Sequence, residues 1–523
     1  MSRDIFTPFA DGNALAKHAW TEGAFFLGET ASEVHSRLPF EVGMHDDRGF
    51  FVAASARGGK STSLVINNLI RWPGGCFCID VKGELASKTA IRRGRKAAAY
   101  GSGTSVRSFL GQDVAVLDPK LVVEGPARVM RRRYNPLHDL DPDEPGYVTD
   151  VRRLAGAIIV QEHAGAGDHF SHMAQVIVEA LLDYILVCDV DELPETGRAL
   201  PSLHAIISEM AHEPAGEDEP DPLIGRLKPY SGRTLIGDAL GALQVVGDRE
   251  FGSIFSTVTR HLRWLSDPEM RDQLAADADL SLRDLIRDEG TIYVCLPPDE
   301  VKEHIHWLRI LVTMAVQTKI REGAVVQTGY QMLFMLDEFA ALGYMELMQQ
   351  VMSQLPGYGI KAVPIVQSIG QIKRNYGEAH TVFLGNTAGQ IFFSLNDQET
   401  AEYASKWLGQ QEFIEESSSQ SENVNTSEWQ GSWLSRFLEA EEARKHEKRG
   451  GRGASTSVSH SRKVEPIMRP GEIREYTSRS TDRMLVLTAD GAPLFLKRVP
   501  YFERFSTDYY ESQETIMWAE AAS

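Results

Sequence analysis

The chain has 523 residues, of which 42% are hydrophobic and 24% charged, a composition typical of a folded globular protein. At roughly 150 residues per domain, this length predicts three or four domain-sized units. Asp and Glu outnumber Lys and Arg by 73 to 54, and the formal charge of −19 excludes a general basic coat for nucleic acid. The net charge does not exclude nucleic acid bound in a local basic channel. The four cysteines are too few and too scattered for a secreted disulfide framework.

Neither a membrane helix nor a signal peptide is evident. No apolar run reaches the ~18 residues that a membrane helix needs. The N-terminus carries acidic residues and no long apolar stretch, unlike a signal peptide. The sequence therefore predicts a cytoplasmic protein of the reducing cell interior.

The first part of the chain shows strand and helix signals in alternation. Residues 1–48 lack a strong period and are expected to form an N-terminal segment. Over residues 49–139, short apolar runs alternate with helical spacing, which predicts the first part of an α/β domain with a mostly parallel sheet. The expected strands are 49–55, 75–80 and 113–118, with a helix over 61–72.

Helical spacing dominates residues 140–289, where strand-like runs disappear. This change predicts an all-α domain inserted into the α/β domain. Its acidic run, 213–221, contains five carboxylates and no Lys or Arg, which indicates a solvated linker. The expected helices are 154–160, 169–187, 203–210, 234–246, 254–265 and 280–286.

Strand signals resume over residues 290–414, the second part of the α/β domain. Residues 415–463 are rich in Ser, Glu, Gly, Lys and Arg and are expected to form a flexible loop with one short amphipathic turn at 433–438. In residues 464–523, alternation around Asp490-Gly491 predicts a hairpin, followed by a tail. The expected strands of the second part are 290–296, 331–338, 361–368 and 389–395, with a helix over 301–321.

The strongest local motif is ASARGGKS at residues 54–61, which matches G-x-x-x-x-G-K-[ST] except for alanine at the first position. A strand precedes it and a helix follows. Glycines let successive N–H groups point at phosphate oxygens, and the helix N-terminus adds partial positive charge. The alternative is an ordinary glycine-rich turn. The predicted nucleotide-binding residues are Ala54, Arg57, Gly58, Gly59, Lys60, Ser61 and Thr62, with Lys60 on the β- and γ-phosphates and Ser61 on Mg²⁺.

A second motif is the pair Asp337-Glu338, which ends the apolar run MLFML. An apolar strand with carboxylates at its C-terminal tip is how P-loop enzymes hold Mg²⁺ and a water. We predict that Asp337 binds the metal and that Glu338 is the general base. The alternative is that the pair caps the following helix.

Two further strand tips carry polar residues. Gln367 follows an apolar strand, and an amide at this position can sense the γ-phosphate or orient water. The alternative is that Gln367 is an ordinary residue of a surface loop. The segment Asp80-Val-Lys82-Gly-Glu84 can line the same edge of the sheet or form a turn with a helix cap.

Basic clusters and a histidine pair complete the candidates. The clusters 92–96 and 128–133 can contact nucleic-acid phosphates, but a solvated or ion-paired surface is the commoner use. His169 and His172 lack a third ligand nearby, so zinc is not expected there.

Together these segments resemble the TraG/TraD-type (VirD-type) coupling proteins of type IV secretion and conjugation, which are hexameric RecA-like ATPases. The resemblance runs from about residue 49 to 502, and LDEFAALG (336–343) is its most specific match. The other matching segments, in family order, are FCIDVKGEL (77–85), RYNPL (133–137), FGSIFSTVTRHLRWLSDP (251–268), TIYVCLPPDEV (291–301), IVQSIGQIKRNYG (365–377) and NDQETAEYASKWLG (396–409).

The resemblance implies a RecA-like P-loop ATPase fold with ATP and Mg²⁺ as cofactors. It implies Walker B roles for Asp337 and Glu338, a catalytic or coupling role for Gln367, and a substrate-engaging all-α domain. Family members usually begin with two membrane helices, so we expect a soluble variant at the inner face of the membrane or a separate membrane anchor protein. No trans-acting arginine is evident, and Lys361 and Arg374 are the candidates.

The implied function is ATP-driven delivery of DNA or a relaxase–DNA complex to a type IV secretion channel, by a homo-oligomer with a hexamer expected. Two alternatives remain at this stage. One is a receptor for effector proteins of such a system, which the acidic charge slightly favours. The other is a non-secretory DNA translocase of the FtsK/HerA type.

Overall fold

The computed structural model describes residues 15–31, 39–94, 109–160, 169–212, 221–323, 328–418 and 458–505. Three of the expectations above lie outside these ranges in whole or in part. They are the basic residues 95–96, the acidic run apart from Asp221, and residues 419–457 of the loop with its amphipathic turn.

The described residues form an eleven-stranded sheet in the order β2-β1-β13-β12-β9-β3-β8-β7-β4-β6-β5. From β9 to β5 every neighbouring pair is parallel, and the strands from β12 to β2 add antiparallel pairs at one end. The strands are β1 (Phe25–Thr30), β2 (Glu41–Met44), β3 (Gly49–Ala54), β4 (Cys76–Asp80), β5 (Val114–Leu117), β6 (Thr291–Cys295), β7 (Met332–Leu336), β8 (Ile360–Val366), β9 (Thr387–Phe393), β12 (Arg483–Thr488) and β13 (Leu494–Lys497). This is the predicted α/β class with a mostly parallel sheet.

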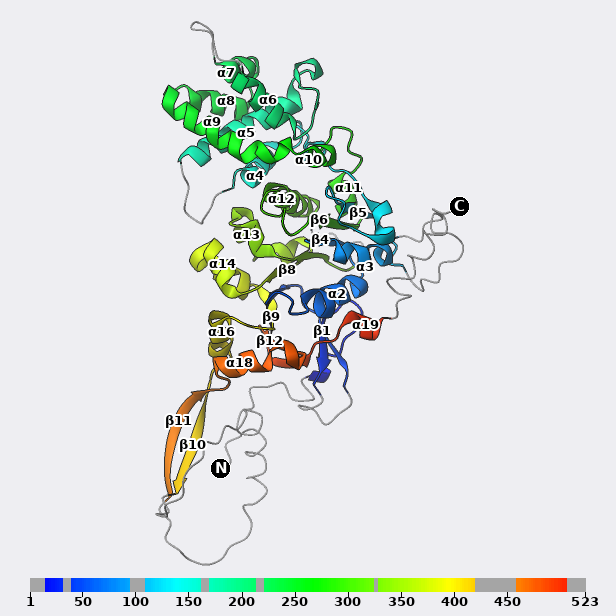
Figure 1. Cartoon of the computed structure of the whole chain (residues 1–523), viewed down its shortest axis with the longest axis vertical. Helices are drawn as coiled ribbons and strands as arrows, with labels where there is room; N and C mark the ends of the chain where they lie inside the picture. Colours follow the sequence, from blue (N-terminus) through cyan, green and yellow to red (C-terminus); the bar gives the residue numbers. More distant parts are fainter. Residues whose placement is uncertain are drawn as a thin grey trace, which may run out of the picture.

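The central strands are continuous apolar runs because helices cover both faces of the sheet. In β3, Phe51 and Ala53 belong to one hydrophobic core, while Phe50, Val52 and Ala54 belong to the other. One face carries α2 (Ile66–Arg71), α3 (Glu84–Arg93) and α19 (Tyr501–Arg504) (Figure 1). The other face carries α12 (Ile305–Glu322), α13 (Glu346–Val351), α14 (Ile369–Tyr376), α15 (Thr381–Gly385), α16 (Gln398–Leu408) and α18 (Pro470–Tyr476).

Between β5 and β6 the described elements are all helices, and those from α4 (Tyr147–Ile158) to α10 (Pro268–Gln273) gather at one end of the molecule (Figure 1). We call residues 147–287 the helical block. α5 is the central helix of this block. By length and composition it could cross a membrane, but 61% of its apolar stretch is buried inside the protein, which is typical of a core helix in a globular unit. The helices are α4 (Tyr147–Ile158), α5 (His169–Val187), α6 (Ser202–His212), α7 (Pro222–Leu227), α8 (Thr234–Leu243), α9 (Asp248–Leu262), α10 (Pro268–Gln273) and α11 (Leu282–Arg287).

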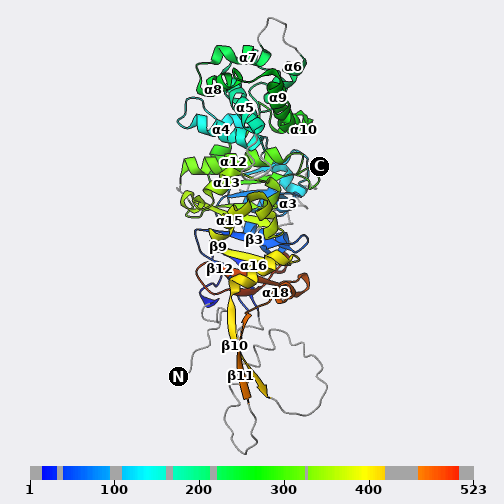
Figure 2. The ribbon, with the colours of Figure 1, turned by 90° about the vertical axis from the view of Figure 1, so that its left-hand side faces the viewer.

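Two features differ from expectation. Within the N-terminal segment, in which no strong period was evident, Phe25–Thr30 and Glu41–Met44 form β1 and β2 and extend the sheet. The prediction of a loop over residues 415–463 is wrong at both its ends. β10 (Gln410–Ser418) and β11 (Val458–Pro466) pair antiparallel as a two-stranded ribbon that projects from the end opposite the helical block (Figures 1 and 2).

Candidate nucleotide-binding site

The turn after β3 has the backbone of a phosphate-binding loop. Arg57 and Gly59 have positive φ angles of 57° and 86°, which bend the chain sharply before the helix that begins at Ser61 (π-helical η1, Ser61–Val65, continuing as α2). A Cβ on Gly58 would lie 2.8 Å from Cβ of Ser394, so this position admits only glycine without a shift. The motif predicted from the sequence therefore folds as a tight turn between β3 and the helix.

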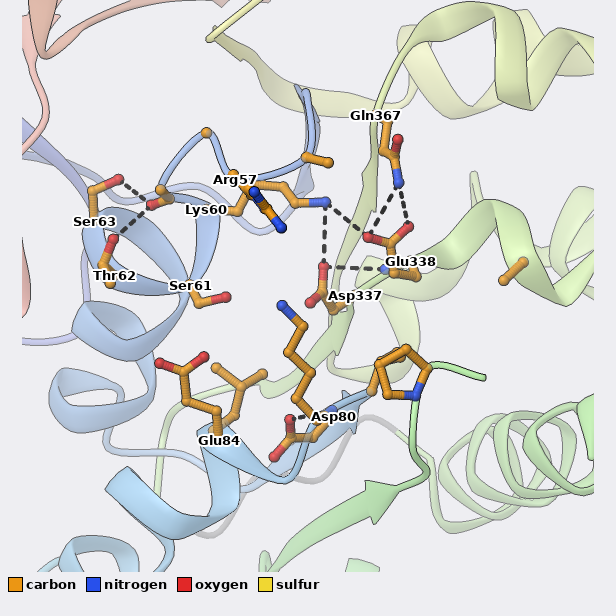
Figure 3. Close-up of a pocket in the computed structure, with 18 of the residues that line it drawn as sticks. Arg57, Lys60, Ser61, Thr62, Ser63, Asp80, Glu84, Asp337, Glu338 and Gln367 are labelled. Atoms are coloured by element: carbon orange, nitrogen blue, oxygen red, sulfur yellow. Dashed lines mark hydrogen bonds and ion pairs between the residues drawn. The ribbon is translucent and has the colours of Figure 1, made fainter. Parts of the chain in front are cut away.

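Hydroxyl and amide groups at the start of the helix hold this turn. The backbone N–H of Ser63 donates to the Gly59 carbonyl at 2.9 Å, and the hydroxyls of Thr62 and Ser63 donate to the same oxygen at 3.2 and 2.7 Å. Ser61 is half-buried and lines the pocket (Figure 3). The helix N-terminus behind Ser61 supplies the partial positive charge that favours anions.

Lys60 points from the turn to the tip of β7. Its Nζ lies 3.1 Å from Oε1 of Glu338 and 3.8 Å from Oδ1 of Asp337 (Figure 3). Burial raises the pKa of Asp337, and the neighbouring Lys60 ammonium opposes that rise. The sequence separated these residues by almost 280 positions, and the parallel sheet brings them together.

Gln367 completes this group. It follows β8, and its Nε2 donates to Oε2 of Glu338 at 3.2 Å. Its backbone N–H donates to the side-chain oxygen of Gln371 at 2.9 Å, which orients the residue. Glu338 has a left-handed backbone, φ 53° and ψ 36°, and its N–H donates to Oδ1 of Asp337 at 3.1 Å. Lys60, Asp337, Glu338 and Gln367 therefore form one connected network.

Asp80 lies at the tip of β4 in the same pocket. It is 2% exposed and accepts backbone N–H bonds from Ala86 at 2.8 Å and from Lys82 at 3.3 Å. Burial raises its pKa to about 7, against the lowering effect of those bonds. Lys82 and Glu84 also line the pocket, so both readings of this segment apply: it forms a turn before α3, and it borders the site.

The pocket has a volume of about 870 Å³ and encloses most of the predicted binding residues. Ala54 is the exception, because its side chain is fully buried in the hydrophobic core at the end of β3. Sequence reasoning did not predict that the C-terminal hairpin and the residues beside it line one side of the pocket. There, the buried Arg498 donates to the Gly58 carbonyl at 2.6 Å. The lining residues missed by sequence reasoning include Pro298, Val301, Lys302, Arg479, Asp482, Arg498 and Pro500.

The donor set of the pocket fits Mg²⁺. A serine hydroxyl and a buried carboxylate, Ser61 and Asp337, are hard oxygen ligands of the kind this cation takes together with phosphate oxygens and waters. Ser61, Asp337 and Glu338 line the same pocket as the positive-φ turn.

Three of the four arginines in the second cluster are ion-paired within the chain, and the exposed Arg128 donates to the Gly125 carbonyl at 3.0 Å. Arg131 donates to the buried Asp118 at 2.9 Å, Arg132 to Asp279 at 2.9 Å, and Arg133 contacts both Asp272 and Asp277. Two members of the cluster 92–96 lie outside the described residues. Of the rest, Arg93 is fully buried and bonds to carbonyl groups of its own subunit.

The prediction of Lys361 as a candidate trans-acting cation is wrong. This residue is 2% exposed at the start of β8 and donates to the Arg48 carbonyl at 2.9 Å, with burial lowering its pKa to about 8. Gln367 follows the other end of the strand, about 20 Å away at roughly 3.3 Å per residue. Arg374 is exposed on α14 and stays a prediction.

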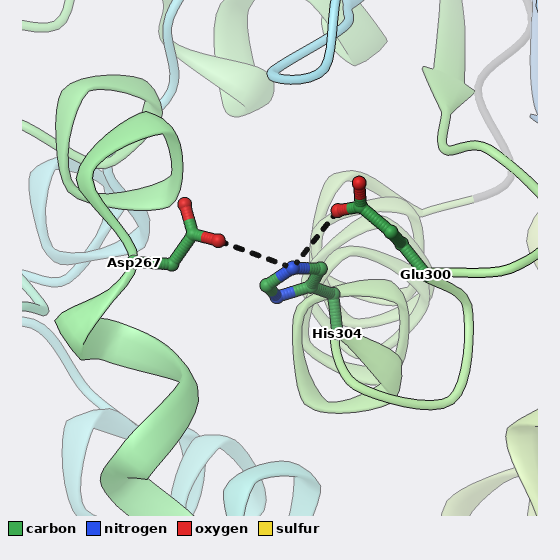
Figure 4. A group of neighbouring side chains, drawn as sticks. All are labelled: Asp267, Glu300 and His304. Atoms are coloured by element: carbon green, nitrogen blue, oxygen red, sulfur yellow. Dashed lines mark ion pairs between the residues drawn. The ribbon is translucent and has the colours of Figure 1, made fainter.

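A separate charged cluster joins the helical block to the loop after β6 (Figure 4). Nε2 of buried His304 lies 3.5 Å from Asp267 and 3.3 Å from Glu300. The Lys120 ammonium lies 2.8 and 2.9 Å from the same two carboxylates. Because this ammonium already forms ion pairs with both carboxylates, we assign no metal to the cluster. Nε2 of the exposed His169 lies 2.6 Å from Oε1 of Glu250.

The sheet order, the turn after β3 and the carboxylates after β7 define a P-loop nucleotide-binding protein of the RecA-like class. Residues 13–522 match the family described as type IV secretory system conjugative DNA transfer, and the chain belongs to that family.

Several relatives and solved structures are similar to the chain. It is 27% identical over 475 residues to Protein VirD4 of Rhizobium rhizogenes, covering 88% of this chain and 60% of that protein. It is 26% identical over 378 residues to the conjugal transfer protein TraG of Escherichia coli, covering 69% of this chain and 55% of that protein. The chain thus spans less than two thirds of the length of these relatives.

The fold is that of the bacterial conjugative coupling protein TrwBdeltaN70, with a TM-score of 0.61 at 13% identity, covering 94% of this chain and 92% of that one. Other TrwB structures are complexes with the ATP analogue ADPNP, or with ADP and Mg²⁺.

Proposed function

We propose that this chain is an ATP-hydrolysing coupling protein that recruits a DNA or nucleoprotein substrate and delivers it to a type IV secretion or conjugation channel. The observation that carries the proposal is the network of Lys60, Asp337, Glu338 and Gln367 beside a phosphate-binding turn. Membership of the conjugative DNA transfer family supports the delivery role. The complexes of TrwB with ADPNP and with ADP and Mg²⁺ support nucleotide and magnesium as cofactors.

The residues suggest a hydrolytic mechanism. Ser61 and Asp337 would hold Mg²⁺, which supplies charge neutralisation at the β- and γ-phosphates. Lys60 donates to those phosphates and stabilises the charge that develops as the bond to the leaving group breaks. Glu338 accepts the proton of the attacking water at a carboxylate oxygen. Gln367 fixes the orientation of that carboxylate through its 3.2 Å bond.

The setting of the reaction is also part of the proposal. By family resemblance, the chain works as a homo-oligomer, with a hexamer expected, at the inner face of the bacterial membrane. Its partners are the channel components and a separate or attached membrane anchor.

One observation favours a protein substrate as the second candidate. The described arginines at 131–133, which were candidates for phosphate contacts, are paired with aspartates of the same chain. The net charge of −19 points in the same direction. In this case the helical block would receive effector proteins, and ATP hydrolysis would not respond to DNA.

The test is the steady-state rate of phosphate release with and without single- and double-stranded DNA. The matched variants are Lys60→Ala and Lys373→Ala. Lys373 also pairs with a glutamate, Glu399, at 3.0 Å, but it lies on α14 outside the pocket. We expect DNA-stimulated turnover that only Lys60→Ala abolishes. Turnover indifferent to DNA favours the protein receptor, and turnover that survives Lys60→Ala overturns the assignment of the site.

A further inference from the structure

Arg309 lies where the helical block meets the nucleotide-binding sheet. It belongs to the second turn of α12, a helix that runs between the helical block and the sheet (Figure 1). Arg309 is 3% exposed. Its described hydrogen bonds all go to main-chain carbonyl groups and none to a carboxylate.

These carbonyl groups belong to the C-terminal ends of two separate helices. Nε donates to Ala157 at 3.0 Å and Nη2 to Gly156 at 3.3 Å, both in the last turn of α4. Nη1 donates to Leu342 at 2.8 Å and to Tyr344 at 2.7 Å, at the end of the short helix η8 (Phe339–Leu342). The last carbonyls of a helix lack partners within the helix and carry partial negative charge, so one guanidinium satisfies both ends.

The second of these ends leads directly to the proposed general base. Glu338 is the N-cap of η8, and its carbonyl accepts the Ala341 N–H at 2.7 Å. On the other side, Asn375 of α14 donates to the Ala340 carbonyl at 2.8 Å. One short turn therefore separates Arg309 from Glu338. The left-handed backbone of Glu338 is the kind of conformation that persists only when surrounding contacts fix it.

The junction also has room to move. A cavity of about 250 Å³ lies beside the guanidinium, between α4, α12 and α13. Gly156, Ala157, Tyr344 and Met345 line it, so the two clamped ends border free space on this side.

We infer that Arg309 is a positioning residue that ties the end of α4 to the Glu338 turn, so that displacement of the helical block by substrate changes the placement of the general base. The inference rests on the proposed hydrolysis at Glu338, and it names the route by which substrate engagement reaches that site. Arg309 does not touch the nucleotide pocket and acts only through η8.

The chain offers a matched control in Arg93. It is also fully buried, and it donates to the carbonyls of Leu69 at 2.7 Å and Trp72 at 3.0 Å, without a carboxylate partner among those contacts. These acceptors lie in α2 and the connection to β4, away from the helical block and from Glu338. Arg93→Lys therefore reproduces the loss of buried guanidinium bonds without breaking the proposed link.

The experiment compares Arg309→Lys, Arg93→Lys and the unchanged chain in three measurements. They are the affinity for AMP-PNP, the turnover number with and without DNA or effector, and hydrogen exchange of residues 150–160 with and without AMP-PNP. We expect Arg309→Lys to bind AMP-PNP within about twofold of the unchanged chain. Its turnover should fall at least tenfold, and both substrate stimulation and the exchange response of α4 should disappear. Arg93→Lys should keep all three.

Any outcome other than this expected pattern contradicts the inference. Normal stimulated turnover in Arg309→Lys overturns it, as does equal loss in Arg93→Lys, which would mean that general destabilisation is the cause. If Arg309→Lys does not fold, the unchanged chain decides: AMP-PNP must alter exchange at residues 150–160, and an unaltered pattern overturns the link. Failure of the unchanged chain to bind AMP-PNP refutes the proposed function itself, and is recognised by that binding measurement alone.

Discussion

Replacing Glu338 by glutamine should move nucleotide affinity and turnover in opposite directions. Nζ of Lys60 lies 3.1 Å from Oε1 of Glu338, so the lysine must leave this carboxylate to reach a phosphate. At an effective dielectric constant of about 20, the Coulomb attraction at this distance is about 5 kcal/mol. The Glu338 side chain is 30% exposed, and solvent screening reduces the net value to about 1 kcal/mol. Glu338→Gln should therefore bind ATP about fivefold more tightly.

The same substitution removes the proposed general base. Loss of such a group slows the chemical step by roughly 10² to 10⁴, or about 3 to 5 kcal/mol in the barrier. The amide is close in shape to the carboxylate and keeps one oxygen for the Nε2 donor of Gln367, so the pocket should retain its structure. Slow turnover with tighter binding is the combined signature.

The assay pairs titration of a fluorescent ATP analogue with the rate of phosphate release. Glu399→Gln is the matched control, because Glu399 pairs with Lys373 at 3.0 Å on the surface of the same chain. Its affinity and rate should stay within about twofold of the unchanged protein. A Glu338→Gln turnover within threefold of the unchanged protein would refute the role of Glu338. Weaker ATP binding would refute the competition between Glu338 and phosphate for Lys60.

Three further predictions concern the pocket walls. The pKa of Asp80 is raised from 3.8 to about 7, so its contribution to stability is present below about pH 4 and is lost as pH rises to about 7. The stability of Asp80→Asn relative to the unchanged chain should therefore rise between pH 5 and pH 8 in urea unfolding, by about 3 kcal/mol at 1.36 kcal/mol per pH unit over the roughly two units from pH 5 to the pKa of about 7; a constant difference contradicts this. Arg498→Met removes the 2.6 Å bond to the Gly58 carbonyl and should weaken ATP binding by about 1.5 to 3 kcal/mol, or ten- to a hundredfold, in the same titration. Ser61→Ala should abolish the gain in ATP affinity on adding Mg²⁺, and an undiminished gain would exclude Ser61 as a ligand.

The central part of the sheet could be predicted because its strands carry local signals. β3, β4, β7 and β8 are buried on both faces, so each is a short, mostly apolar run that ends in a polar residue or is followed directly by one. In a parallel sheet these polar ends fall on one edge. The grouping of Lys60, Asp80, Asp337 and Gln367 in one pocket follows from that rule.

The antiparallel extension carried weaker signals. β1 and β2 are short, and β2 contains only four residues, so its alternation cannot be distinguished from loop sequence. β10 and β11 are polar strands that pair with each other outside the main sheet, and apolar periodicity is absent from them. Their pairing depends on main-chain hydrogen bonds that composition does not reveal.

Contacts between remote segments were beyond prediction for a different reason. Arg498 lies 440 positions from Gly58, and Arg309 binds carbonyl groups, which every residue has. No residue type marks the acceptors of either arginine. Motif analysis therefore found the groups proposed to act on phosphate and missed the groups that position them.

The two buried arginines have related consequences for the site. Arg498 fixes the phosphate-binding turn from the C-terminal hairpin, and Arg309 fixes the Glu338 turn from the helical block. Lys60 and Glu338 contact each other across the space between these two turns. A displacement of either turn by about 1 Å would change this contact by a large fraction of its 3.1 Å length. Hydrolysis would then depend on both turns being in place at once.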